Sequence, residues 1–147
     1  MRSGYTNFNT EVIVLKRRNF GDSDRIITFL SRDFGKVTYI AKGVRLPKSR
    51  KRGHLEPFSH ARISTSGHDP SKMNVITEAQ VMENFAEVKN NLTRSSFAYF
   101  IVECVLRLTQ EHEENRELFD MTISYLRKLT KTAKLKNLRR EFTIAIL

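Results

Sequence analysis

The first eighty residues alternate between short apolar runs and turn-forming residues, a pattern that predicts five short strands. In the third run, Val37, Tyr39 and Ala41 occupy every second position, as in a strand that buries one face. Gly, Pro, Asp, Asn and Ser separate the runs, and these residues favour turns. We expect strands at residues 10–18, 25–31, 36–44, 57–65 and 73–81.

The second half of the chain changes to helical spacing. From Leu92 onward, apolar residues recur every three or four positions, which places them on one face of a helix. The same spacing returns in residues 118–129, after an acidic stretch at 111–117 that would complement the N-terminal end of a helix dipole. A third helix is expected from Leu138. Because no Gly, Asn or Pro follows it before Leu147, the helical domain is expected to be truncated.

Together these elements predict an α+β fold with two domains. Five short strands joined by one long basic connection suit a five-stranded OB-type β-barrel, which we expect in residues 1–82. The α-helical domain, in partial form, is expected in residues 83–147.

The charge of the chain is positive and unevenly distributed. The chain of 147 residues has 26 Lys and Arg against 16 Asp and Glu, a formal net charge of +10. Residues 1–80 hold 15 of these basic residues against 7 acidic ones, and residues 42–53, here called the basic loop, hold six basic residues and no acidic one. Pro and Gly in this segment predict a flexible loop. Such a surface attracts polyanions, so nucleic acid is the expected partner; the simpler alternative is a solvated or nuclear-localisation-like tract.

The sequence gives no pattern typical of catalysis or metal binding. The six glycines are isolated, so no Walker-type loop or Gly-x-Gly-x-x-Gly motif is present. His112 and Glu113 begin like a zinc-protease helix, but Arg116 occupies the position of the second His. Cys104 is the one cysteine and is expected to be a buried, inert thiol. We therefore predict no catalytic residue, no cofactor, no metal and no membrane segment, in a soluble intracellular protein.

A surface that binds single strands needs cations for the phosphates and aromatic faces for unstacked bases. The predicted phosphate contacts are Lys36, Lys42, Arg45, Lys48, Arg50, Lys51 and Arg52, followed by Arg17, Arg18, Arg25 and Arg62. The possible stacking residues are Tyr39, Phe20, Phe34 and Phe58, although an aromatic residue in a strand more often belongs to the core.

Several short segments in a fixed order suggest a family. They are EVIVL at 11–15, FGDSDRIIT at 20–28, GKV at 35–37, AKGVR at 41–45 and KSR at 48–50. In order and spacing they resemble the N-terminal portion of the bacterial recombination mediator family RecO. The likeness continues more weakly through ITEA at 76–79 and into the predicted helices.

The resemblance implies an OB domain joined to a helical domain in a DNA repair protein that is not an enzyme. Members of that family bind single- and double-stranded DNA, anneal complementary strands, engage the acidic tail of single-strand-binding protein and, with RecR, help to load RecA. It also implies a cytoplasmic, nucleoid-associated location. Many members carry a four-cysteine zinc module beyond the position of Leu147; no cysteine follows Cys104 here, so no zinc site is predicted.

Two other functions remain open from the residues alone. An RNA-binding OB module would use the same groove chemistry, because phosphates and base faces are common to both nucleic acids. A peptide-docking adaptor would use its helical half for binding, and the basic loop would only steer the encounter.

Overall fold

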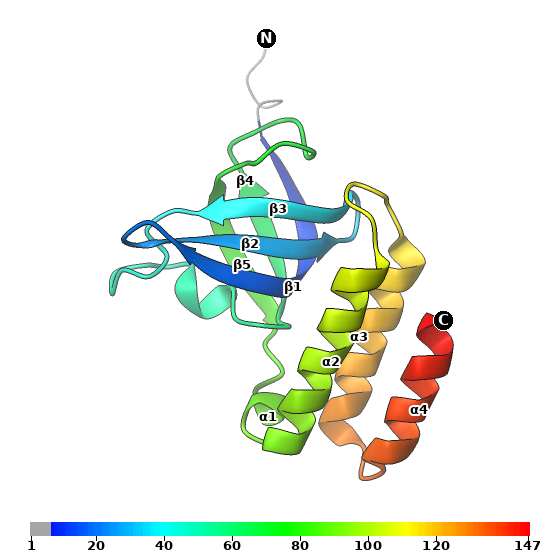
Figure 1. Ribbon diagram of the computed structural model, residues 1–147. Helices are drawn as coiled ribbons and strands as arrows, with labels where there is room; N and C mark the ends of the chain where they lie inside the picture. Colours follow the sequence, from blue (N-terminus) through cyan, green and yellow to red (C-terminus); the bar gives the residue numbers. More distant parts are fainter. Residues whose placement is uncertain (1–6) are drawn as a thin grey trace.

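The computed structural model describes residues 7–147 and shows a curled antiparallel sheet with helices packed against one side (Figure 1). The sheet order is β3-β2-β1-β4-β5. At the open edges, the Ile40 amide donates to the Asn74 carbonyl at 2.9 Å, so β3 approaches the chain that leads into β5. This confirms the OB-type barrel. Its strands are β1 (Phe8–Phe20), β2 (Asp24–Ser31), β3 (Gly35–Ala41), β4 (His60–Thr65) and β5 (Ile76–Glu83).

All five expected strands are present. β3 and β4 are shorter than expected at the ends that lead into and out of the basic loop. β3 ends at Ala41 because the chain turns at Gly43, whose φ is +67° and whose amide donates to Asp24 Oδ1 at 2.7 Å. β4 begins at His60 because Phe58 has a φ of +49°, which interrupts an extended strand. The connection between β3 and β4 is therefore longer than the sequence predicts, and a 3₁₀ turn, η2 (Arg52–His54), begins near the end of the basic loop.

Four consecutive residues of β1 are buried and divide between two cores. Val12 and Val14 point into the barrel with Ile27, Phe29 and other residues of its interior. Ile13 and Leu15 belong to the second core, which the helices form against the outside of the barrel. β1 is therefore a wall shared by the two domains.

The second domain consists of α1 (Ala86–Lys89), α2 (Leu92–Leu108), α3 (Arg116–Lys131) and α4 (Leu135–Ile146), with the last three side by side (Figure 1). Asn91 and Asn115 cap α2 and α3, each accepting a backbone N–H at 3.0 Å. Most of the acidic stretch precedes α3 as a loop, and Glu117 alone lies in its first turn. Within residues 7–147, no helix is both long and apolar enough to cross a membrane.

The turn between β2 and β3 docks against the loop between α2 and α3. The Lys36 carbonyl accepts the His112 amide at 2.9 Å. Gly35 has a φ of +71°, and a Cβ added there would overlap the backbone of Glu113. Glycine is needed at this position for both reasons, the backbone conformation and the close approach.

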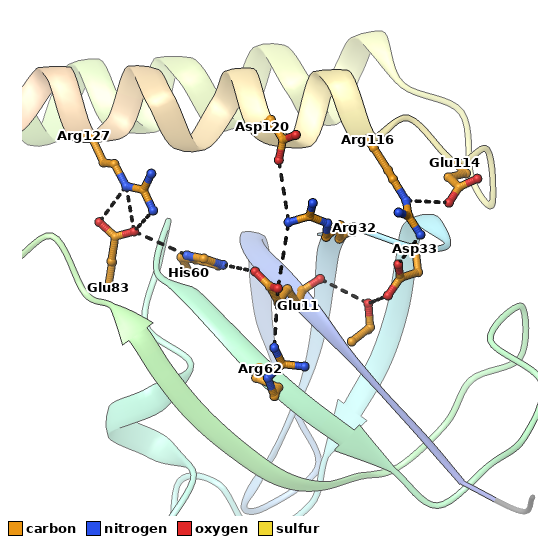
Figure 2. A network of polar contacts seen from close by, with 11 residues as sticks. Glu11, Arg32, Asp33, His60, Arg62, Glu83, Glu114, Arg116, Asp120 and Arg127 are labelled. Carbon is orange, nitrogen blue, oxygen red and sulfur yellow. Dashed lines mark hydrogen bonds and ion pairs between the residues drawn. The ribbon is translucent and has the colours of Figure 1, made fainter.

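A row of charged side chains continues this contact along α3 (Figure 2). His60 in β4 is buried, with Nε2 2.9 Å from Glu11 Oε1 and Nδ1 3.6 Å from Glu83 Oε1. Its ring meets Phe119 of α3 edge-on at 5.8 Å. The Arg127 guanidinium donates to both Glu83 oxygens and, with smaller help from His60, lowers the pKa of Glu83 despite its partial burial.

Two further arginines complete the row and cross between the domains. Arg116 of α3 donates to Asp33 in the β2–β3 turn at 2.9 Å. Arg32 lies 3.9 Å from Asp120 of α3 and 4.0 Å from Glu11 of β1. The helical domain is therefore held to the barrel by apolar burial and by paired charges.

Replacing Gly35 with alanine should destabilise the chain by about 3 kcal/mol or more, because the left-handed backbone and the overlap with Glu113 both add to the cost. Urea unfolding measures this change. Gly21→Ala is the matched control: its φ is +60°, but no atom lies within 4 Å of the added Cβ, so about 1–2 kcal/mol is expected. Equal losses in the two variants would contradict the docking role of Gly35.

The Glu83→Gln variant should lose part of the acid sensitivity of folding. Because the folded-state pKa of Glu83 is lowered, its stabilising contribution is complete above about pH 4.3, the ordinary glutamate value, and is lost as the pH falls through the folded-state pKa. Thermal unfolding between pH 7 and pH 3 should therefore show a shallower decline for Glu83→Gln than for the unchanged chain. Glu78→Gln, at an exposed β5 position outside any ion pair of the described residues, should decline like the unchanged chain.

Candidate nucleic-acid interface

The basic loop is held against the barrel at both of its ends. Near its start, the Arg45 amide donates to the Ser23 carbonyl at 3.0 Å, and Val44 is fully buried. Just after its end, His54 Nδ1 accepts the Val81 amide of β5 at 2.9 Å, and Leu55 fills the barrel core. The cations between these points are thus presented by a loop with fixed ends and internal turns.

A groove of about 630 Å³ lies between the basic loop and β5. Lys48 and Arg50 are exposed, and none of the loop cations has a carboxylate within 4.0 Å among the described residues. Glu78 is the acidic residue in the lining. The groove is positive and concave, as a site for a phosphate backbone must be. Its lining residues are Lys42, Gly43, Lys48, Ser49, Arg50, Lys51, His54, Thr77, Glu78, Ala79 and Gln80.

Arg45 and Arg25, two of the other predicted arginines, lie near the turn between β1 and β2. Arg45 donates through Nη2 to the Gly21 carbonyl at 2.6 Å and through Nε to the Asp24 carbonyl at 3.1 Å. Burial, and then the neighbouring charge of Arg17, lower the pKa of Arg25, and Arg45 and Arg52 act in the same direction. This turn and the groove therefore form one continuous basic edge of the barrel.

Comparison with known proteins now identifies the family. The profile described as "Recombination protein O N terminal" matches residues 1–85, and the profile described as "Recombination protein O C terminal" matches residues 89–147. The chain belongs to the RecO family.

Its relatives carry the name "DNA repair protein RecO". The protein from Syntrophus aciditrophicus is 36% identical over 92% of this chain and 52% of its own length. The protein from Pelotomaculum thermopropionicum is 33% identical, over 83% of this chain and 47% of its own length. The protein from Dehalococcoides mccartyi is 28% identical, over 96% of this chain and 55% of its own length. The chain thus spans about half the length of the relatives that it matches.

The likeness to a solved structure is distant. A chain of a replication protein A heterotrimer bound to ssDNA matches with a TM-score of 0.38 and 7% identity, over 66% of this chain and 74% of that chain.

In this RecO-family chain, Lys36 lies apart from the basic edge. Its Nζ donates to the Leu106 carbonyl at 2.9 Å and to the Thr109 carbonyl at 2.8 Å, at the C-terminal end of α2. A positive charge there satisfies helix carbonyls and complements the helix dipole. The structure thus places Lys36 in a contact that joins the two domains, and its role as a phosphate contact stays a prediction.

Tyr39 lies in the core of the barrel. Its side chain is 0% exposed, its hydroxyl donates to the Pro70 carbonyl at 2.8 Å, and burial raises its pKa. No face of the ring is free to stack on a base. Phe58 is also buried, and Phe34 is partly buried against Phe8, so Phe20 is the candidate stacking residue that remains exposed.

The second group of predicted arginines divides between paired and unpaired side chains. Arg17 donates to Glu56 at 2.9 Å, and Arg62 lies 3.5 Å from Glu11, whereas Arg18 has no carboxylate partner among the described residues. The β5 wall of the groove, residues 77–80, was not among the predicted site residues. No local pattern marks it, because the pairing of β5 with the loop is long-range.

No group of three or more His, Cys, Asp and Glu side chains within residues 7–147 is arranged to hold a metal ion. Cys104 is partly buried on α2, and this burial raises the pKa of its thiol. A thiol with a raised pKa is a poor nucleophile at neutral pH.

Lys36→Met should destabilise the chain by about 1–3 kcal/mol, because two helix carbonyls lose a charged donor. It should leave nucleic-acid affinity unchanged. Lys42→Met, at the other end of β3 and in the groove, should do the opposite: little change in urea unfolding and weaker binding of an oligonucleotide. A loss of affinity in Lys36→Met equal to that in Lys42→Met would return Lys36 to the binding site.

Proposed function

We propose that this chain binds DNA along the basic edge of its barrel, as part of a protein of DNA repair and recombination. The observation that carries the proposal is the groove whose loop cations, Lys42, Lys48, Arg50 and Lys51, are held in place without carboxylate partners among the described residues. Family membership supports the repair role, since the relatives are named DNA repair proteins. The proposed activity is non-covalent.

The groove cations would contact phosphates and not base edges, so a single strand of any sequence could bind there. Two DNA strands repel each other through their backbones. A protein that holds one strand on a positive surface lowers the cost of approach of the complementary strand. Annealing of complementary strands follows from this property, and we propose it as the mechanistic contribution of the barrel; double-stranded DNA would bind through the same phosphate contacts.

The proposal extends to the partner proteins that the resemblance to the family implies. We propose that the acidic tail of single-strand-binding protein is bound by the helical domain, where a cleft of about 690 Å³ between α3 and α4 is lined by Arg127, Lys128, Lys131 and Lys134. Opposite charge and the partly apolar cleft both favour such a peptide. We also propose that the protein acts with RecR to load RecA. The proposed location is the cytoplasm, in association with the nucleoid.

Two rival functions give different results in binding experiments. An RNA-binding module would prefer an RNA strand over a DNA strand of the same sequence. An adaptor would lose nucleic-acid binding at physiological salt and keep peptide binding. Acceleration of duplex formation from labelled complementary strands favours the mediator over both, whereas sequestration without acceleration favours a generic binder.

The decisive variant replaces Lys48, Arg50 and Lys51 with alanine. If each contacts one phosphate, the slope of log K against log salt for single-stranded DNA should become less negative by about 2, since each neutralised phosphate contributes about 0.7. Fluorescence anisotropy at several salt concentrations measures the slope.

The matched control replaces Lys131, Lys134 and Lys136 with alanine. It removes the same charge from exposed sites on the helical domain. Its DNA slope should stay within about 0.5 of that of the unchanged chain. An unchanged slope in the loop variant, or an equal change in both variants, would overturn the groove as the DNA site.

A further inference from the structure

Phe20 is an exposed aromatic residue at the tip of the β1–β2 hairpin. Its side chain is 46% exposed, whereas Phe29, Tyr39 and Phe58 of the barrel are at most 1% exposed. Single exposed apolar side chains are common on protein surfaces, so exposure alone assigns no role. The surroundings of Phe20 distinguish it from such a residue.

The first distinguishing observation is that the hairpin tip is rigidly supported. Phe20 is the last residue of β1 and pairs with Asp24, with Gly21 in the left-handed region between them. Arg45 holds the tip through three contacts: Nη2 to the Gly21 carbonyl, Nε to the Asp24 carbonyl and its amide to the Ser23 carbonyl. A ring presented on a fixed backbone loses little entropy when a ligand binds.

The second observation is a cation beside the ring. The Arg18 guanidinium carbon lies 5.9 Å from the centre of the Phe20 ring, and both side chains are exposed. A guanidinium plane and a phenyl ring both stack on nucleobases, which have π faces of their own. Arg18 can also contact a neighbouring phosphate.

The third observation is continuity with the groove. The same Arg45 that contacts Gly21, next to Phe20, belongs to the basic loop, and Lys42 and Lys48 of that loop line the groove. The hairpin tip and the loop lie together on one side of the barrel, away from the helices (Figure 1). Asp24 Oδ1 accepts the Gly43 amide, and the Asp24 side chain is only partly exposed. Asp22 is the fully exposed carboxylate of the tip.

We propose that Phe20 and Arg18 form a platform on which an unpaired nucleobase stacks while its backbone continues into the basic groove. This inference rests on the proposed function and deepens it. It assigns the barrel a selectivity that charge alone does not give, because bases in a duplex are already stacked on each other and cannot reach the ring.

The test compares Phe20→Ala with the unchanged chain on single-stranded and double-stranded DNA of equal length. We expect roughly tenfold weaker binding of the single strand, no change for the duplex, and an unchanged salt slope because no charge is removed. A strand containing 2-aminopurine reports the contact directly: its fluorescence should be quenched by the unchanged chain and recover in the variant.

Three further variants separate stacking from other effects. Phe20→Trp should keep or strengthen binding, because the π face is larger. Tyr99→Ala removes an aromatic side chain that is 52% exposed on α2, in the helical domain, and should bind DNA like the unchanged chain. Arg18→Ala should make the salt slope less negative by about 0.7, a change that Phe20→Ala lacks. Thermal unfolding of each variant checks that the fold is intact.

The outcomes distinguish this platform from the groove. If Phe20→Ala binds single strands as tightly as the unchanged chain, or loses single- and double-strand affinity equally, the platform is overturned and the groove stands. If the unchanged chain binds neither form of DNA, the proposed function fails, and the platform fails with it.

Discussion

Val12 to Leu15 in β1 are buried on both faces of the strand, and the placement of every other element depends on this double burial. Val12 and Val14 fill the barrel, while Ile13 and Leu15 are covered by the helical domain. A shift of one residue would exchange the two sets, so the register of β1 fixes both cores at once. Because the helices occupy one side of the barrel, the hairpin tip and the basic loop remain open on the other side (Figure 1).

β3 separates the contact with the helical domain from the basic edge of the barrel. Lys36 and Lys42 stand at its two ends, about 20 Å apart for a strand of this length. At one end, Lys36 donates to carbonyls at the C-terminal end of α2. At the other end, Lys42 lines the groove.

Local patterns predicted the elements well, and long-range contacts explain what they missed. The alternation of Val37, Tyr39 and Ala41 gave the correct buried face, since period and burial are both local properties. That face also put Tyr39 out of reach of a base. Lys36 and Lys42 are chemically identical in the sequence, and only the approach of α2, seventy residues away, distinguishes them. The four-residue helix α1 is too short to show a period, and the β5 side of the groove depends on tertiary pairing.

The position of the acidic residues, more than the number of basic ones, determines which part of the surface stays positive. Glu11, Asp33 and Glu83 face arginines or histidine at the contact between the domains, and Glu56 pairs with Arg17. A paired charge contributes little field at a distance, whereas an unpaired one acts over about a Debye length, close to 8 Å at physiological salt. The carboxylates that hold the domains together are therefore unavailable to neutralise the basic loop. The same interactions that fix the fold leave its opposite edge positive.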